Sequence, residues 1–379
     1  MNPVFATLPT TIFETMSRLA REHDAVNLGQ GFPDDPGPED VRRAAADAVM
    51  TGWNQYPPMM GLPVLREAIA AHYQRFQGLS LDPAREVMVT SGATEAIAAS
   101  LLAMIEPGDE VILFQPMYDA YLPLVRRAGG VPRLVRLTPP DWRLTIEALE
   151  AVATRRTRAV LLNNPLNPAG SLFSDEDLAA LARFCADRDL IAISDEVWEH
   201  VVFDGRPFRS LMSFAGMRER TIKIGSAGKI FALTGWKVGL VAAAPALMGV
   251  LAKAHQFLTF TTPPNLQTAV AYGLGKEDGY FQGMRQTLQR SRDRFAEGLT
   301  RLGYGVLPSA GTYFLNVDLA ASGIAETDQD FCLDLVARRG VAAIPVSAFY
   351  AEEPVTSIVR FCFAKTDAVL DAALARLAR

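Results

Sequence analysis

Seven short apolar segments between residues 86 and 243 constrain what this chain can fold into more than any other feature. They are Glu86–Thr90, Glu110–Phe114, Val131–Leu137, Arg158–Asn163, Leu190–Ser194, Thr221–Ile224 and Gly239–Ala243. Most are rich in valine, isoleucine and leucine without regular polar alternation, a pattern typical of strands buried on both faces. Helical patterns such as Thr94–Ile105 and Ser174–Arg188 lie between them. Strands that alternate with helices predict an α/β fold with a mostly parallel sheet.

The pattern changes after Asn265. Apolar side chains then recur at helical spacing and predict one long helix that leaves the sheet domain: Phe281, Met284, Leu288, Phe295, Leu299 and Leu302. The remainder, Gly303–Arg379, alternates strands at Tyr313–Val317 and Ser357–Phe363 with helices, which indicates a smaller α+β domain. We therefore expect a large domain over residues 45–275. Residues 1–44 and 276–379 should form an N-terminal segment and the small C-terminal domain.

Composition and charge narrow the classes of function. The 379 residues are 49% hydrophobic, enough for one large core and a second domain. A net charge of −5 argues against nucleic acid or an anionic membrane as a main partner, and no apolar stretch reaches the roughly 18 residues of a membrane span. Residues 1–20 lack a secretory signal pattern and the three cysteines are typical of reduced core residues, so we expect a cytoplasmic protein. The four scattered histidines lack metal-ligand spacing, and we expect no metal.

The unusual residues lie in the loops that follow the apolar segments, where open α/β sheets bind their ligands. Lys229 lies in one such loop, among the small and apolar residues of Ser226–Lys237. An amine held in a low-dielectric pocket loses proton affinity and becomes a nucleophile toward carbonyl groups. A lone lysine is more often a surface residue with a buried stem, so the other loops must decide between the two interpretations.

Two further loops offer groups for a planar, anionic ligand. Ser91-Gly92-Ala93-Thr94-Glu95 opens a helix, and its small residues and free N–H groups suit a phosphate, although a plain helix cap fits as well. Tyr118 ends another apolar segment, where it could stack on a ring or simply pack.

Polar residues that follow two other strands complete the pattern. Asn167 belongs to the stiff Asn163–Gly170 turn, which is either structural or places its asparagines toward a ligand. Asp195 ends a buried strand, so it needs an ion-pair partner or could hold a heterocyclic nitrogen protonated. Together these loops supply the groups of a pyridoxal phosphate site: an anion cradle, a stacking aromatic ring, an asparagine, a buried acid and a buried lysine.

Three motifs make the chain resemble the fold-type I, class I/II aminotransferases over almost its whole length. They are Asn27–Asp34 (NLGQGFPD), Ser226–Lys229 (SAGK) with Thr234–Lys237 (TGWK), and Arg360–Lys365 (RFCFAK). They are similar to the branch that holds kynurenine, glutamine and methionine aminotransferases. The resemblance implies a large domain of the fold-type I transferase kind and pyridoxal 5'-phosphate as cofactor.

The resemblance also implies roles for individual residues. Lys229 would form the imine with the cofactor and shuttle protons, Asp195 would pair with the pyridine nitrogen, and Asn167 would donate to the ring phenolate oxygen. Tyr118 matches the ring-stacking aromatic. The phosphate-binding positions are matched by Gly92, Ala93, Thr94, Ser226 and Lys237. Many relatives have arginine where this chain has Lys237. The ammonium group of lysine would bind the phosphate as a point charge, whereas the guanidinium group of arginine can donate two parallel hydrogen bonds.

Three more residues extend the implied site toward substrate and partner. Tyr56 resembles the tyrosine that reaches the phosphate of the neighbouring subunit, which implies a homodimer with shared active sites. Arg360 would clamp the substrate α-carboxylate, with a structural salt bridge as the alternative. Gly31 would add a backbone contact to the substrate, and Asn167 would contact the substrate as well as the cofactor.

One position departs from the family pattern. The family has a tyrosine three residues after the aspartate, and here that position is Trp198. An indole N–H donates a hydrogen bond but neither ionises nor accepts one, so Trp198 either fills the same volume or changes the pKa of the cofactor–lysine imine.

The resemblance implies transamination in ping-pong order between an amino acid and a 2-oxo acid. Phe32, Tyr118 and Phe260 are candidates to line the substrate pocket, and no motif supplies a second arginine for an acidic side chain. We therefore expect a largely neutral or aromatic donor such as methionine, glutamine or kynurenine. The alternatives are an aspartate-type aminotransferase, a cysteine-S-conjugate β-lyase and a non-catalytic cofactor-binding regulatory module, which the acidic charge disfavours.

Overall fold

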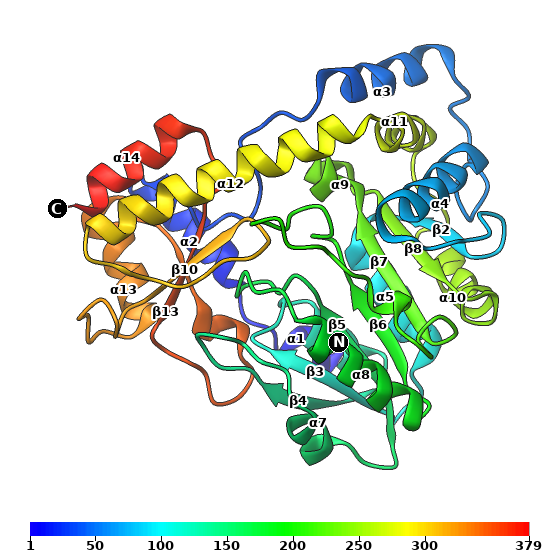
Figure 1. Cartoon of the computed structure of the whole chain (residues 1–379), viewed down its shortest axis with the longest axis horizontal. Helices are drawn as coiled ribbons and strands as arrows, with labels where there is room; N and C mark the ends of the chain where they lie inside the picture. The colour runs from blue at the N-terminus through cyan, green and yellow to red at the C-terminus, as the bar shows by residue number, and fades with distance from the viewer. Residues whose placement is uncertain (379) are drawn as a thin grey trace.

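The computed structural model describes residues 1–378, and its largest feature is a seven-stranded sheet (Figure 1). The strand order is β2-β8-β7-β6-β5-β3-β4. Six strands share one direction, and β8 runs antiparallel to both of its neighbours, β2 and β7. The bounds are Val87–Thr90 (β2), Glu110–Gln115 (β3), Val131–Arg136 (β4), Thr157–Asn163 (β5), Ile191–Asp195 (β6), Thr221–Ser226 (β7) and Gly239–Ala243 (β8). The predicted α/β class and mostly parallel sheet are confirmed.

Helices cover both faces of this sheet, which explains why its strands read as continuous apolar runs. Along β3, Val111 and Leu113 pack with α5, α6 and α10 on one face, whereas Ile112 and Phe114 pack with α7 and α8 on the other. At the β2–β8 end, α3, α4 and α11 cover the second face. The helix bounds are Glu39–Thr51 (α3), Pro63–Gln77 (α4), Gly92–Met104 (α5), Tyr121–Arg127 (α6), Ile146–Val152 (α7), Asp175–Asp187 (α8), Pro245–Leu258 (α10) and Pro264–Leu274 (α11).

All seven predicted strands are present, and none of their ends is displaced by more than two residues. One detail differs: β4 is partly exposed because it is the last strand of the sheet. The predicted helices correspond to α5 and α8, and Ser174 caps α8 through a reciprocal capping box with Asp177. The sequence patterns therefore locate the sheet domain closely.

The small domain is an antiparallel sheet of order β12-β13-β10-β9 covered by helices. The long predicted helix is α12, and the predicted strands are β10 and β13. Figure 1 shows α12 running from α11 across to α14. The bounds are Asp278–Arg301 (α12), Gly305–Val306 (β9), Phe314–Asp318 (β10), Asp328–Asp334 (α13), Ile344–Pro345 (β12), Ile358–Cys362 (β13) and Asp367–Leu377 (α14).

The N-terminal segment packs on the small domain. Its first helices are α1 (Pro3–Ala6) and α2 (Ile12–Glu22), and β1 (Val26–Asn27) pairs in parallel with β11 (Val341–Ala342). The boundary predicted at residue 44 falls inside α3, which packs against α11 of the sheet domain. The division into two domains at that residue stays a prediction.

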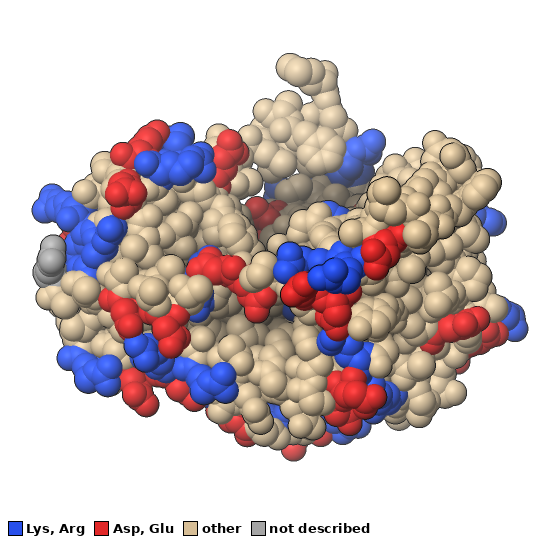
Figure 2. Space-filling view, turned by 90° about the horizontal axis from the view of Figure 1, so that it is seen from above, with Lys and Arg blue, Asp and Glu red and all other residues tan. Residues whose placement is uncertain are grey.

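Surface charge, helix character and the cysteines complete the description of the fold. Acidic and basic side chains are interspersed on the face that Figure 2 shows. Within the described residues, none of the helices has the length and apolar character that crossing a membrane requires. The three cysteines are buried and unpaired.

Candidate active site

A cavity of about 180 Å³ lies at the carboxyl ends of the parallel strands. Its lining includes ten residues that the sequence predicted: Gly92, Ala93, Thr94, Tyr118, Asn167, Asp195, Trp198, Ser226, Lys229 and Lys237. They come from five separate loops, because the carboxyl ends of parallel strands meet at one edge of the sheet. The cavity also contacts Asn163, an asparagine of the predicted turn, and Tyr121 and Thr234, for which the sequence predicted no individual role.

One end of the cavity carries the positive groups that a dianion such as phosphate needs. Helix α5 begins there, and Ser91 makes no side-chain cap hydrogen bond within residues 1–378, so first-turn N–H groups remain available to a ligand. Gly92 has φ +79°, and a Cβ atom at this position would lie 3.1 Å from Cε and 3.4 Å from Nζ of Lys237. The Lys237 ammonium therefore lies beside the positive end of the helix dipole, a combination that suits a phosphate.

The pairing of β2 with β8 brings these groups together. Thr90 at the end of β2 pairs with Gly239 at the start of β8. A Cβ atom at Gly239 would lie 2.7 Å from the carbonyl carbon of Gly92, so glycine permits this close backbone approach. Lys237 lies two residues before Gly239 and thus reaches the start of α5.

The carboxylate of Asp195 lies in the buried part of the cavity. Burial raises its pKa to about 6, while hydrogen bonds from Tyr121 and from the Val197 N–H lower it. The Tyr121 hydroxyl donates to Oδ2 of Asp195. This contact was missed by the sequence analysis, although Tyr121 follows Tyr118 by three residues, about one helical turn, and so could have been suspected.

Lys229 lies in a low-dielectric environment. Burial lowers its pKa to about 8. Its Nζ is 3.4 Å from the Gly31 carbonyl oxygen and 4.6 Å from the centre of the Trp198 ring. The Tyr313 hydroxyl donates a 2.8 Å hydrogen bond to the Lys229 carbonyl, which fixes the backbone. A neutral, nucleophilic amine is therefore accessible near neutral pH.

Two asparagines link this region to the rest of the site. Asn163 donates from Nδ2 to the Asp195 carbonyl oxygen at 3.0 Å, and its Oδ1 accepts the Asn167 N–H at 2.8 Å. The Oδ1 of Asn167 in turn accepts a 2.9 Å hydrogen bond from Nη1 of Arg360. The loop after β5 is thereby fixed against both the end of β6 and the small domain.

Arg360 is a buried cation without an anionic hydrogen-bond partner. Besides Asn167 it contacts the Gly29 carbonyl oxygen at 2.9 Å, and its Nε has no hydrogen-bond partner within the described chain. Its guanidinium lies 3.8 Å from the centre of the Phe314 ring. Burial lowers its pKa to about 9, so the group stays charged at neutral pH. Within residues 1–378, Arg360 makes its hydrogen bonds to neutral oxygens and forms no salt bridge of the kind that the structural alternative requires.

Five predicted residues lie outside the cavity lining. Gly31 and Arg360 contact the lining residues Lys229 and Asn167, whereas Tyr56, Phe32 and Phe260 lie farther out. Tyr56 is 81% exposed and packs edge-on against Phe260, with 5.6 Å between the ring centres. Phe32 is also exposed, and its carbonyl oxygen accepts a hydrogen bond from Lys365. Within one chain, neither Tyr56 nor these two phenylalanines contacts the cavity around Lys229.

The residues present fit pyridoxal phosphate. The start of α5 with Lys237 matches its phosphate, the buried Asp195 matches a protonated ring nitrogen, and Lys229 matches its aldehyde. The Tyr118 ring and the Asn167 side chain line the remaining walls. The arrangement supplies each group that this cofactor needs.

Comparison with known proteins agrees with this fit. Residues 23–377 match the family described as aminotransferase class I and II. Methionine aminotransferase of Escherichia coli K12 is 40% identical to this chain, and the match covers 98% of this chain and 96% of the relative. Human kynurenine–oxoglutarate transaminase 1 is 37% identical, and the match covers 94% of this chain and 92% of the relative. The solved N-succinyldiaminopimelate aminotransferase of Mycobacterium tuberculosis is 45% identical, with a TM-score of 0.96 and coverage of 100% and 99%. The chain therefore belongs to the class I and II aminotransferases and is a pyridoxal-phosphate-dependent transaminase of fold type I.

Proposed function

We propose that this transaminase moves the amino group of a largely neutral or aromatic L-amino acid, such as methionine, glutamine or a kynurenine-like donor, to a 2-oxo acid. The two half-reactions follow one another in ping-pong order. The observation that carries the proposal is Arg360, a buried guanidinium whose hydrogen-bond partners are both neutral oxygens. A buried cation of this kind is stabilised by an anion, and the α-carboxylate of the substrate supplies one.

Each residue at the cavity then has a task. When bound, pyridoxal phosphate supplies an aldehyde that links to amines and a ring that withdraws electrons from the substrate Cα. Lys229 would hold the cofactor through its Nζ, and the same amine would take the proton from the substrate Cα and return it. Asp195 would keep the ring nitrogen protonated, Asn167 would donate to the ring oxygen, and Tyr118 would supply the aromatic wall against the ring. The phosphate would be bound by Gly92, Ala93, Thr94, Ser226 and Lys237, and Gly31 would contact the substrate through its backbone.

A second cavity supports a neutral side chain on the substrate. It has a volume of about 510 Å³ and shares Tyr118 with the Lys229 cavity. It also includes Phe349, whose ring centre is 5.1 Å from the Arg360 guanidinium. Its described lining contains no lysine or arginine, and Asp119 is its one charged residue. A side-chain carboxylate would find no cation here, which disfavours aspartate and the additional carboxylates of N-succinyldiaminopimelate.

The exposed aromatic residues support a homodimer with shared active sites. Tyr56 lies at the surface beside Phe260, and Trp53 and Phe257 are exposed in the same two segments of the chain. Large exposed apolar side chains that gather in this way are typical of protein interfaces. In the proposed dimer, Tyr56 reaches the phosphate site of the partner subunit. We place the enzyme in the cytoplasm on the strength of its reduced, buried cysteines.

A half-reaction screen tests the substrate proposal. Each amino acid is added to the holoenzyme without an acceptor, and the visible absorbance of the bound cofactor is followed. We expect rapid loss of the band with methionine, glutamine and kynurenine, and slow or no change with aspartate and N-succinyldiaminopimelate. The reverse order would refute the proposal. Formation of pyruvate from a cysteine conjugate without an acceptor would instead identify a β-lyase.

A further inference from the structure

A second buried lysine lies on the strand that leads to Lys229. Lys223 Nζ is 2.8 Å from Oε2 of Glu196 and 2.6 Å from Oε2 of Glu199, and all three side chains are at most 1% exposed. Burial alone would lower the pKa of Lys223, but the two carboxylates raise it above its usual value, so the amine is charged. The surroundings therefore shift the pKa values of the two lysines in opposite directions, upward for Lys223 and downward for Lys229.

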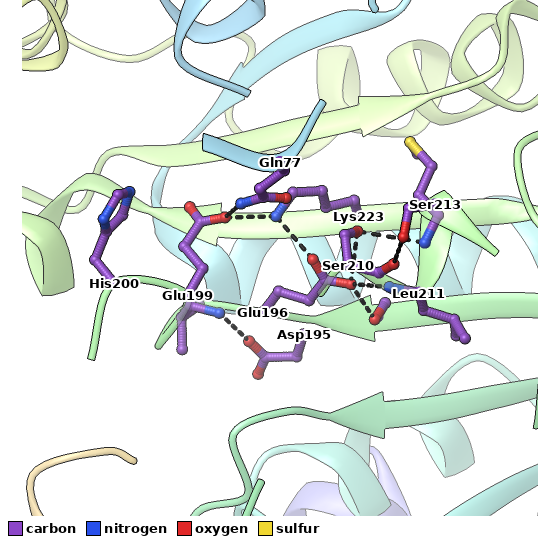
Figure 3. Close-up of polar contacts among 12 residues, drawn as sticks. Gln77, Asp195, Glu196, Glu199, His200, Ser210, Leu211, Ser213 and Lys223 are labelled. Carbon is purple, nitrogen blue, oxygen red and sulfur yellow. Dashed lines mark hydrogen bonds and ion pairs between the residues drawn. The ribbon is translucent and has the colours of Figure 1, made fainter. Parts of the chain in front are cut away.

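Both carboxylates come from the turn that carries the cofactor-facing residues Asp195 and Trp198. The turn is closed by hydrogen bonds from the Glu199 N–H to the Glu196 carbonyl (3.0 Å) and from the Val201 N–H to the Trp198 carbonyl (2.7 Å). Asp195 and Trp198 line the cavity, whereas the side chains of Glu196 and Glu199 extend toward Lys223, as Figure 3 shows for the two glutamates. The same short segment thus faces the cofactor site with one pair of side chains and the ion cluster with the other.

The register of the sheet places this cluster between the turn that follows β6 and the strand β7. β6 and β7 are parallel, with Ser194 opposite Lys223 and Asp195 opposite Ile224. β7 continues to Ser226, and Lys229 lies in the short helix α9 (Ala227–Ile230) that follows. One ammonium therefore joins the turn that follows Asp195 to the strand that leads to Lys229.

Glu196 is the fully satisfied member of the cluster. Its Oε1 accepts hydrogen bonds from the hydroxyls of Ser194 (2.8 Å) and Ser210 (3.0 Å) and from the Leu211 N–H (3.0 Å), while Oε2 accepts from Lys223. Buried charges are stable only when their lone pairs are used in this way. Glu196 therefore anchors the first residue of the turn.

Glu199 is held less completely. Its Oε2 accepts from Lys223 and Gln77, but in the described part of the chain Oε1 has no hydrogen-bond partner. The space around it is filled, since a Cβ atom at Gly225 would lie 3.0 Å from Oε1 and would collide with the Tyr73 hydroxyl. The Lys223 ammonium also lies 4.3 Å from the centre of the Tyr73 ring. The position of Glu199, and with it the far end of the turn, depends on Lys223.

We propose that Lys223 is a positioning residue, which holds the Asp195–Trp198 turn in fixed register with Lys229 by binding Glu196 and Glu199. Lys223 touches neither cofactor nor substrate in this proposal and acts through the two cavity residues. The proposal rests on the roles assigned to Asp195 and Lys229 above.

The test compares Lys223→Met and Glu199→Gln with a matched control, Glu110→Gln. Glu110 is equally buried and bound by Arg133 at 2.6 Å, but it lies at the amino end of β3, whereas the cavity is at the carboxyl ends of the strands. Thermal stability, the dissociation constant for pyridoxal phosphate added to apoprotein, and the pH dependence of the visible absorbance are measured for each protein.

We expect Lys223→Met and Glu199→Gln to weaken cofactor binding by about tenfold, equivalent to about 1.4 kcal/mol, and to shift the pH dependence of the absorbance. Glu110→Gln should lower thermal stability and leave both cofactor measurements at the wild-type values. Wild-type cofactor affinity and pH dependence in the two cluster variants would overturn the proposal. Glu199→Gln keeps the side-chain shape, so it remains informative if Lys223→Met does not fold. If wild type itself forms no visible band, the proposed role of Lys229 fails, a result distinct from failure of the positioning role.

Discussion

Removal of the Tyr121 hydroxyl should raise the pH below which the chain loses its affinity for pyridoxal phosphate. Tyr121 donates to Oδ2 of Asp195, and this hydrogen bond stabilises the ionised carboxylate in a buried position. In Tyr121→Phe the aromatic ring remains and only the donor is lost. The carboxylate then becomes protonated at a higher pH and ceases to pair with the ring nitrogen of the cofactor.

The size of the shift follows from the strength of the bond. Burial raises the pKa of Asp195 to about 6 with the Tyr121 bond in place. A hydrogen bond to a charged group is worth about 1.5–3 kcal/mol, and 1.36 kcal/mol corresponds to one pH unit, so the pKa should rise by roughly 1–2 units. The direction of the pH dependence follows from the charge of Asp195, because only the ionised carboxylate pairs with the ring nitrogen. Cofactor affinity is therefore present above the pKa of Asp195 and is lost as the pH falls through it. The variant should therefore lose affinity at a pH higher by that amount.

The assay is titration of apoprotein with pyridoxal phosphate between pH 5 and 9, followed by the visible absorbance of the complex. Titration of Lys229 and of the cofactor phosphate affects both proteins equally, so the difference between the two profiles reports on Asp195. Tyr350→Phe is the control, because its hydroxyl donates to the Leu137 carbonyl, away from Asp195. Superimposable profiles for wild type and Tyr121→Phe would refute the reasoning.

Three further substitutions probe other parts of the site. Lys229→Ala should abolish turnover and the visible band of the bound cofactor, and an undiminished rate in a steady-state assay would exclude the assigned role. Arg360→Lys should raise KM for the amino acid about 10- to 100-fold with a smaller effect on kcat, since loss of a charge-assisted hydrogen bond costs about 1.5–3 kcal/mol; an unchanged KM would contradict the carboxylate clamp. Trp198→Tyr should change the pH at which the visible absorbance of the holoenzyme changes, because a phenol ionises and accepts hydrogen bonds whereas an indole does not. Identical spectroscopic titrations would show that Trp198 only fills space.

The strands and the loops that follow them were predictable from sequence because each depends on local pattern. A run such as β8 needs only its own apolar residues to be recognised, and all seven such runs are strands. The direction of β8 was not predictable, because it depends on pairing with β2, some 150 residues earlier in the chain. Hydrophobic periodicity shows burial on two faces and contains no information on strand polarity.

The same distinction applies to the site. Lys229 and Asp195 were recognisable because a charged residue after an apolar strand is unusual. The Tyr121–Asp195 hydrogen bond joins residues 74 positions apart, and its detection required the fold. Lys223 was recognised only as part of an apolar strand. Its two carboxylate partners lie in the turn that follows β6, the neighbouring strand, and the sequence alone does not show that pairing. Residues that act on other residues, rather than on the ligand, were therefore the ones that sequence reasoning missed.

The antiparallel insertion of β8 has a consequence for biosynthesis. The phosphate end of the cavity needs the start of α5 and Lys237 side by side, and they meet only when β8 pairs with β2. During translation, residues up to about Ala243 must therefore leave the ribosome before the anion-binding half of the cavity can exist. Pairing between segments so far apart in the chain is intrinsically slow, because the entropy of closing the intervening loop must be overcome first. Because pyridoxal phosphate needs the complete cavity, its binding should stabilise only chains in which β8 has paired with β2 and β7.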